Sequence, residues 1–143
     1  MAHISLVTLG VADLAVATAF YEALGWRRSS ASVSGEVTFL RGSPVLALFG
    51  LTDLRADAAL PAAPPDEPAS PRSALAMNLA SEAAVDAVFA TARAVGARVC
   101  QPARRTDWGG YSGYFQDLDG HLWEVAHNPF FALGADGSVT LPD

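Results

Sequence analysis

Apolar and polar positions change their spacing along this chain in an order that occurs twice. Residues 4–11 are mostly aliphatic or β-branched, which favours a strand. Apolar residues then recur at spacings of three and four between Asp13 and Gly25, which predicts an amphipathic helix capped by Asp13 and ended before Gly25. Short extended runs separated by turns containing Gly and Ser follow at residues 26–33, 36–41 and 44–49. The first part of the chain is therefore predicted to be one βαβββ unit.

A proline-rich segment, residues 50–72, interrupts this pattern. Its prolines stand among Ala, Asp and Glu at positions 61, 64, 65, 68 and 71. Proline at this density disfavours helix and interior strand, so we expect an extended surface connector. The segment is either a solvated linker or a lid over a cavity.

The first pattern returns after the connector. Residues 73–80 read as a strand, and Ser81 and Gly96 bound an amphipathic helix. A strand at 97–102, an irregular stretch at 103–110 and a hairpin follow. The fold class is therefore α+β, with two tandem βαβββ modules, residues 4–49 and 73–127, in a single domain. The tail, residues 128–143, carries Phe130 and Phe131, which we expect to pack on the domain or on a partner chain.

The hairpin of the second module has the most informative side chains. A four-residue turn at 117–120 would place Gln116 opposite His121, and directly opposed residues share a face of the sheet. One face would then carry Tyr111, Phe115, Leu122, Glu124 and Ala126, and the other Tyr114, Trp123 and Val125. Because an unpaired buried carboxylate is costly, Glu124 predicts that its face lines a solvated cavity.

Composition excludes several classes of function. The 143 residues are 51% apolar, which is enough for a core, and the formal charge is −6. All nine basic residues are scattered arginines, so we expect neither nucleic-acid binding nor binding to a membrane surface. No apolar run is long enough to span a bilayer, and Cys100 has no internal partner, which agrees with a reducing compartment. We expect a soluble, cytoplasmic protein.

Two motifs in this order resemble the vicinal oxygen chelate superfamily, the glyoxalase, bleomycin-resistance and extradiol-dioxygenase group. The first comprises residues 7–14 (VTLGVADL) with Phe20-Tyr21 and Leu24-Gly25-Trp26, and the second residues 117–125 (DLDGHLWEV). The resemblance implies a curved mixed sheet around a cleft, with helices on the outside, and a homodimer. It leaves the activity open, because the superfamily contains lyases, dioxygenases, epimerases and non-catalytic drug-sequestering proteins.

Metal-dependent members of this superfamily bind an ion with one residue from the first and one from the last strand of each module. The corresponding positions here are Leu6, Ala47, Ala74 and Glu124, of which only Glu124 has a donor side chain. A divalent ion needs three or four donors, so we expect a cleft without metal or other cofactor. We expect the small-molecule site to be lined by Leu6, Thr8, Thr38, Ala47, Asn78, Trp108, Tyr111, Phe115 and Glu124, among other residues of the same strands.

Alternatives stay open for two of these residues. Glu124 can instead pair with an arginine in an ordinary core contact, and Trp108 either lays its indole over a planar ligand or plugs the end of the sheet. The leading hypothesis is a metal-independent protein that binds, and possibly sequesters, an aromatic or planar small molecule. The alternative is a glyoxalase- or lyase-type or dioxygenase-like enzyme that uses Glu124 as general base or metal ligand.

Overall fold

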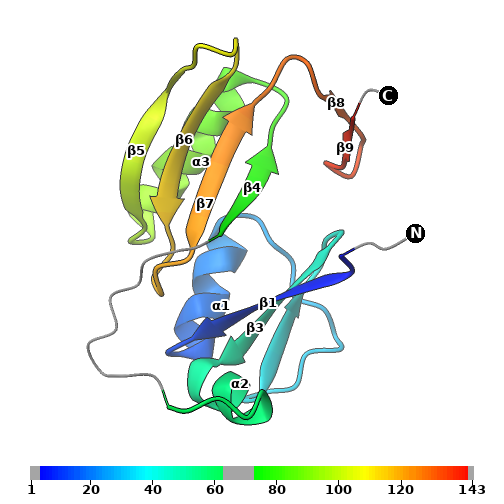
Figure 1. Cartoon of the computed structure of the whole chain (residues 1–143), viewed down its shortest axis with the longest axis vertical. Helices are drawn as coiled ribbons and strands as arrows, with labels where there is room; N and C mark the ends of the chain where they lie inside the picture. Colours follow the sequence, from blue (N-terminus) through cyan, green and yellow to red (C-terminus); the bar gives the residue numbers. More distant parts are fainter. Residues whose placement is uncertain (1–3, 63–72, 142–143) are drawn as a thin grey trace. The chain divides into compact units, whose positions relative to one another are not determined.

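The structure is a computed structural model that describes residues 4–62 and 73–141. The chain divides into two compact units, residues 1–70 and 71–143. Both combine helices with a mixed β-sheet, so the predicted α+β class is confirmed (Figure 1).

The first unit is a three-stranded sheet with two helices. Its sheet has the order β1-β3-β2, in which β3 runs parallel to β1 and antiparallel to β2. The elements are β1 (Leu6–Val11), α1 (Leu14–Ala23), β2 (Val37–Leu40), β3 (Val45–Gly50) and α2 (Leu51–Asp57).

Helix α1 forms where the sequence predicts it. The Asp13 carboxylate accepts a hydrogen bond from the Val16 amide at 2.9 Å, and Gly25 follows the helix with φ of 97°. The helix buries Phe20 and Tyr21 together with small residues, and these side chains meet the core face of the sheet. That face contributes Leu9, Val11, Leu40, Leu46 and Leu48.

The predicted strand at residues 26–33 is wrong, because only two isolated bridges form there, Arg28 with Leu40 and Val33 with Val37. Serine side chains replace much of the expected ladder. The Ser29 hydroxyl accepts from the Ala31 amide, while the Ser32 hydroxyl binds both the amide and the carbonyl of Phe39. Such local side-chain hydrogen bonds offer the backbone an alternative to regular pairing.

The prediction that the connector contains no helix is also wrong. Helix α2 occupies Leu51–Asp57, ahead of the first proline at 61, so no residue in it lacks an amide hydrogen. Leu51 and Leu54 pack so closely on Gly10 that a Cβ there would lie 2.7 and 3.2 Å from their side chains. Residues 63–72 of the connector, and with them the choice between linker and lid, lie outside the described residues.

The second unit has the predicted βαβββ order, and its sheet has the strand order β4-β7-β6-β5, with β4 parallel to β7. Ser81 caps α3 by accepting from the Ala84 amide at 3.1 Å, and Phe89 of α3 meets Phe115 edge to face. The elements are β4 (Ala74–Asn78), α3 (Glu82–Ala94), β5 (Arg98–Arg105), β6 (Tyr111–Gln116) and β7 (Leu122–His127). A small hairpin follows, β8 (Ala132–Leu133) and β9 (Val139–Thr140).

The hairpin between β6 and β7 differs from the predicted register by one residue. The amide of Asp117 donates to the carbonyl of His121, so these two residues flank a three-residue loop. The Asp117 carboxylate accepts from the amides of Asp119 and His121, and Gln116 lies opposite Leu122. A shift of one residue moves each side chain of β7 to the other face relative to β6.

None of the helices in the described part of the chain is both long and apolar enough to cross a membrane.

Candidate functional site: the open faces of the two sheets

In the second unit, α3 lies against one face of the sheet, and the other face has no helix among the described residues of that unit (Figure 1). We call the latter the open face of unit 2. Its side chains form rows across the four strands, because residues paired in register share a face. The central row reads Gln101, Tyr114, Glu124 and Ala76, from β5 to β4.

Glu124 and Tyr114 form a directly opposed pair in this row, one on β7 and the other on β6. Both residues are half-buried. Burial raises the pKa of Tyr114 above its ordinary value, and the negative charge of Glu124 raises it further. Tyr114 therefore stays protonated at neutral pH.

The neighbouring rows place cations at the β5 edge and small residues at the β4 edge. Arg98 lies in register with Gln116, and Arg104 with Ser112. Both guanidinium groups are exposed, and neither forms an ion pair with any described residue. At the opposite edge the rows end in Ala74 and Asn78. The open face therefore combines one carboxylate, two cations, amide groups and a floor of alanines.

We call the side of the first unit's sheet away from α1 its open face, and on that side Leu51 and Leu54 of α2 pack at Gly10. Ala47 of β3 lies between Thr8 of β1 and Phe39 of β2, and Leu6 is paired with Val45. A pocket of about 410 Å³ opens at one end of this face. It is lined by Leu6, Ser29, Ala31, Phe39, Leu40, Arg41, Gly42 and Val45. The face is more apolar than that of unit 2 and has no carboxylate among these residues.

Thr38 does not share the face of Leu6, Thr8 and Ala47. Its hydroxyl lies 2.9 Å from the Thr18 hydroxyl of α1, so it points to the helix side of the sheet. The predicted phase of β2 was therefore one residue off. Phe39, which pairs with Ala47, occupies the position expected for Thr38.

Tyr111 and Phe115 also lie on the helix side, in contrast to the predicted face. The Tyr111 hydroxyl donates to the carboxylate of Asp86 on α3 at 2.8 Å, and Phe115 is fully buried against Phe89. The physical reason is the three-residue loop, which sets Phe115 opposite Trp123 and leaves Tyr114 opposite Glu124. Phe115 is a core residue, and Tyr111 links the sheet to the helix.

Trp108 folds back onto its own loop. A Cβ at Gly110 would overlap the Trp108 ring, and one at Gly109 would lie 3.2 Å from the Phe130 ring. The indole therefore covers Gly110 and is still 46% exposed. Contact between Trp108 and a ligand stays a prediction.

Sequence reasoning missed Tyr114, the partner of Glu124, together with Gln101 and Phe39. Tyr111 and Tyr114 are three residues apart and must point to opposite sides of a regular strand, so only one of them can share the face of Glu124. The choice between them depended on the loop length. The face of Gln101 could not be counted from the sequence either, because bulges shift the register of β5 between Val99 and Arg104.

The residues at the metal positions of the resembling proteins do not fit a divalent ion. Those positions are Leu6, Ala47, Ala74 and Glu124, and the residues in register with Ala47 and Glu124 are Thr8 and Ala76. Even with Thr8 and Ala76 included, the set supplies one carboxylate and one hydroxyl, whereas a divalent ion needs three or four donors. Within residues 4–62 and 73–141, no group of three His, Cys, Asp or Glu side chains is arranged to hold an ion.

The fold agrees with a family match. Residues 2–125 match the model of the Glyoxalase/Bleomycin resistance protein/Dioxygenase superfamily, which covers most of the chain. The protein therefore belongs to this superfamily, as the two sequence motifs predict. A comparison with curated proteins gave no match.

Several solved structures share the fold. A glyoxalase-related enzyme from Fulvimarina pelagi is 34% identical, with a TM-score of 0.87 and full coverage of both chains. A glyoxalase/bleomycin resistance protein/dioxygenase from Nocardioides is 27% identical, with a TM-score of 0.70 over 89% of this chain and 83% of that one. Lactoylglutathione lyase from Agrobacterium tumefaciens is 24% identical, with a TM-score of 0.65 over 90% and 95%, a likeness of fold alone.

Proposed function

We propose that this protein is a metal-independent small-molecule binding protein of the glyoxalase/bleomycin-resistance type. Its ligand site includes the open face of unit 2. The observation that carries the proposal is the Glu124 and Tyr114 pair, a half-buried polar anchor on a sheet face that no helix of its own unit covers. A few fixed polar groups among apolar side chains are characteristic of small-molecule sites.

The chemistry of this face defines the ligand. Glu124 accepts hydrogen bonds, so the ligand carries a donor such as an amide, amine or hydroxyl group. The alanines at positions 74, 76 and 126 leave a flat floor beside the Tyr114 ring, which favours a planar or aromatic body. Arg98 and Arg104 at the edge favour an acidic group at the other end of the molecule.

Metal independence rests on the donor set. Leu6, Ala47, Ala74 and Glu124 occupy the ligand positions of the resembling metal-dependent proteins, and only Glu124 has a donor side chain. A tightly held ion requires more donors than this.

An enzyme is the second candidate, favoured by the similarity to a protein described as a glyoxalase-related enzyme. In this case Glu124, which lies opposite Tyr114 on the open face, acts as general base on a substrate proton beside it. Lactoylglutathione is a suitable first substrate to test, because a lyase named for it shares the fold.

Two variants distinguish binding from catalysis. A panel of planar aromatic compounds with amine, amide and carboxylate groups is screened by thermal shift. The proteins compared are the wild type, Glu124→Gln, Tyr114→Phe and the control Glu36→Gln. Glu36 is an exposed turn residue. We expect hits whose affinity falls about tenfold or more in Glu124→Gln and is unchanged in Glu36→Gln. Equal affinity in Glu124→Gln would place the site elsewhere.

Turnover is followed with lactoylglutathione and with each hit. The binding proposal expects the compound to be recovered unchanged. Turnover by the wild type that is lost in Glu124→Gln, while the variant still binds, would replace it with the enzyme.

A further inference from the structure

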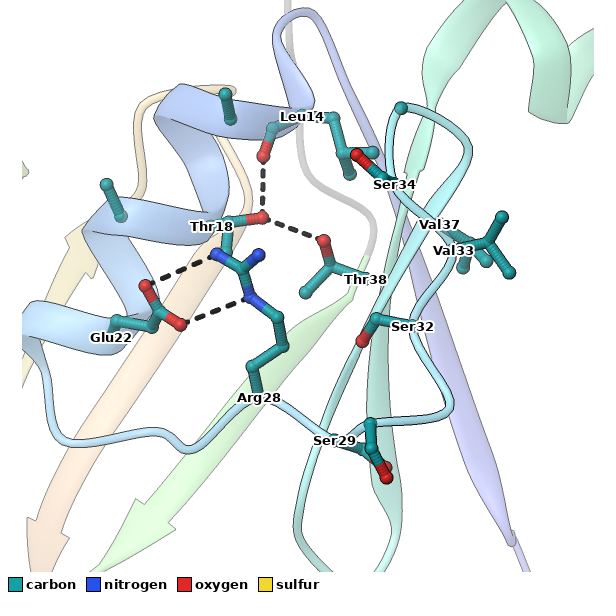
Figure 2. A pocket seen from close by; sticks show the side chains of 14 residues that line it. Leu14, Thr18, Glu22, Arg28, Ser29, Ser32, Val33, Ser34, Val37 and Thr38 are labelled. Atoms are coloured by element: carbon teal, nitrogen blue, oxygen red, sulfur yellow. Dashed lines mark hydrogen bonds and ion pairs between the residues drawn. The ribbon is translucent and has the colours of Figure 1, made fainter.

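A second pocket in the first unit lies on the opposite side of the sheet from the open face. It has a volume of about 420 Å³ and opens between α1 and the segment that leads into β2 (Figure 2). We call it the hydroxyl pocket, because Thr18, Thr38 and four serines contribute to it. Its lining residues are Leu14, Ala15, Thr18, Ala19, Glu22, Arg28, Ser29, Ser30, Ser32, Val33, Ser34, Gly35, Val37 and Thr38.

The floor of the pocket presents hydrogen-bond acceptors. The Thr18 hydroxyl donates to the Leu14 carbonyl at 2.6 Å, so its single proton is already used. The Thr38 hydroxyl, 2.9 Å away, must therefore donate to Thr18 and keeps only lone pairs for a ligand. Both threonines are almost fully buried, and both hydrogen bonds are drawn in Figure 2.

The rim adds groups that can donate as well as accept. The Ser29 hydroxyl accepts from the Ala31 amide and keeps its own proton free to donate. Ser34 is exposed, and its hydroxyl has no hydrogen bond to any described residue. In Figure 2 its oxygen points toward the side of the pocket formed by Leu14. A ligand that satisfies both floor and rim needs groups that both donate and accept, and hydroxyl groups have this property.

The charges of the pocket are already paired. The Arg28 guanidinium binds both oxygens of the Glu22 carboxylate, with Nε at 3.2 Å and Nη2 at 3.5 Å (Figure 2). An exposed pair of this kind adds little stability, but it cancels the local charge. The pocket therefore offers an ionic ligand no excess of opposite charge. Leu14, Val33 and Val37 supply apolar wall for the carbon atoms of a ligand.

We propose that the hydroxyl pocket binds a neutral polyhydroxylated molecule the size of a monosaccharide or cyclic polyol. The volume is within the range of small-molecule sites. The threonines of the floor accept hydrogen bonds, and the serines of the rim can donate them. The wall is apolar, and the one ion pair leaves the pocket with no net charge. This site does not depend on the open faces, so its test is independent of the proposed function.

The first experiment uses myo-inositol as the probe and amide NMR of the full-length protein as the readout. We expect saturable shifts at Thr18, Ser34 and Val37. Ala19→Phe, which fills the pocket from α1, should weaken binding at least about tenfold, whereas Ala23→Phe, on the same helix but outside the lining, should leave it within about twofold. Absence of saturable shifts at these residues in the wild type would overturn the proposal.

The second experiment tests the role of charge. Wild type should prefer myo-inositol to its monophosphate, because Arg28 is occupied by Glu22. Glu22→Gln frees the guanidinium and should reverse this preference. Tighter binding of the phosphate by the wild type would show that the pocket is an anion site and overturn the assignment of a neutral ligand.

Discussion

The two tyrosines of β6 show how one residue of register changes the chemistry of a side chain. Tyr111 donates to Asp86 on the helix side, and Tyr114 lies opposite Glu124 on the open face. Both pKa values are raised, that of Tyr111 mainly by its hydrogen bond to Asp86 and that of Tyr114 mainly by burial and then by Glu124. The pKa of each tyrosine is therefore sensitive to a different carboxylate.

This separation gives a prediction for Glu124→Gln. The substitution removes the charge that raises the pKa of Tyr114, so that pKa should fall toward 10.0, the ordinary value. Tyr111 serves as the internal control, because its shift comes from Asp86 and Glu82. Carbon NMR of the two tyrosine rings during an alkaline titration measures both. An unchanged pKa of Tyr114 would mean that the pair does not form.

The same shift makes stability depend on alkaline pH. A tyrosine whose pKa is raised on folding stabilises the folded state below the unfolded pKa of about 10, and this contribution is lost as pH rises from there through the folded pKa. Tyr114→Phe should therefore show a shallower loss of stability above pH 10 than the wild type. Urea unfolding at a series of pH values measures the difference. Identical slopes would contradict the raised pKa.

Gly113 is the residue whose replacement should disturb the second unit most directly. A Cβ there would lie 2.6 Å from the carbonyl oxygen of Gln101 and 2.7 Å from the Phe89 ring. We expect Gly113→Ala to lower the free energy of unfolding by about 1–3 kcal/mol, because both the backbone of β5 and the core would have to move. Gly25→Ala is the control, since it meets no atom within 4 Å and costs only the strain of its positive φ. A smaller loss in Gly113→Ala than in the control, measured by urea unfolding, would contradict this packing.

At the scale of elements, the three helices differ in what holds them. Helices α1 and α3 each have a side-chain N-cap and buried residues. Helix α2 has seven residues, no side-chain cap and no buried residue. Local stability follows buried contacts and satisfied backbone ends, so α2 should be the first helix to open.

Hydrogen exchange tests this order. The amides of α2 should exchange at least about tenfold faster than those of α1, which lies in the same unit. Gly10→Ala, which pushes against Leu51 and Leu54, should accelerate exchange in α2 further and leave α3 unchanged. Equal protection of α1 and α2 in the wild type would contradict the prediction.

Most elements could be predicted from the sequence because their signals are local. An N-cap, a stripe of apolar residues and a terminal glycine predict α1 and α3. Short apolar runs likewise predict β1 and β4. Two elements were mispredicted where local signals compete. The serines at 29 and 32 bind nearby backbone in place of a partner strand, and the apolar spacing of Leu51 and Leu54 was obscured by the prolines that follow.

The site was predicted less well than the fold. Which residues of two neighbouring strands share a face depends on their register, and an error of one residue in the loop length changes that register. Glu124 on an open face follows from its own strand, but its neighbours depend on a loop that is either three or four residues long. The side chain of Asp117, which caps two amides of that loop, favours the shorter form. Gly120, at a φ of 87°, does not by itself distinguish the two lengths, because glycine at positive φ is common in hairpin loops of either length.

At the scale of the whole molecule, exposed apolar side chains predict assembly. Ile4 and Leu6 in the first unit, and Phe130 and Leu141 in the second, are 42–71% exposed. Soluble chains usually cover such groups, most often in a twofold homodimer. Light scattering should give twice the chain mass of 14.9 kDa at micromolar concentration. Phe130→Ser and Leu6→Ser test which unit contributes, and a monomeric wild type would refute the dimer.

The content of metal tests the proposed function at the same scale. Leu6, Ala47 and Ala74 stand where the resembling metal-dependent proteins have ligands, and Glu124 alone could hold an ion only with water or ligand in the remaining positions. Such an ion would dissociate readily, so protein purified without added metal should contain no stoichiometric divalent ion by elemental analysis. A chelator should change neither the melting temperature nor the affinity for the ligand. The informative control is Ala76→His, which adds an imidazole in register with Glu124 in the same sheet and should retain more zinc than the wild type. About one ion per wild-type chain that survives dialysis against a chelator would refute metal independence and favour the enzyme.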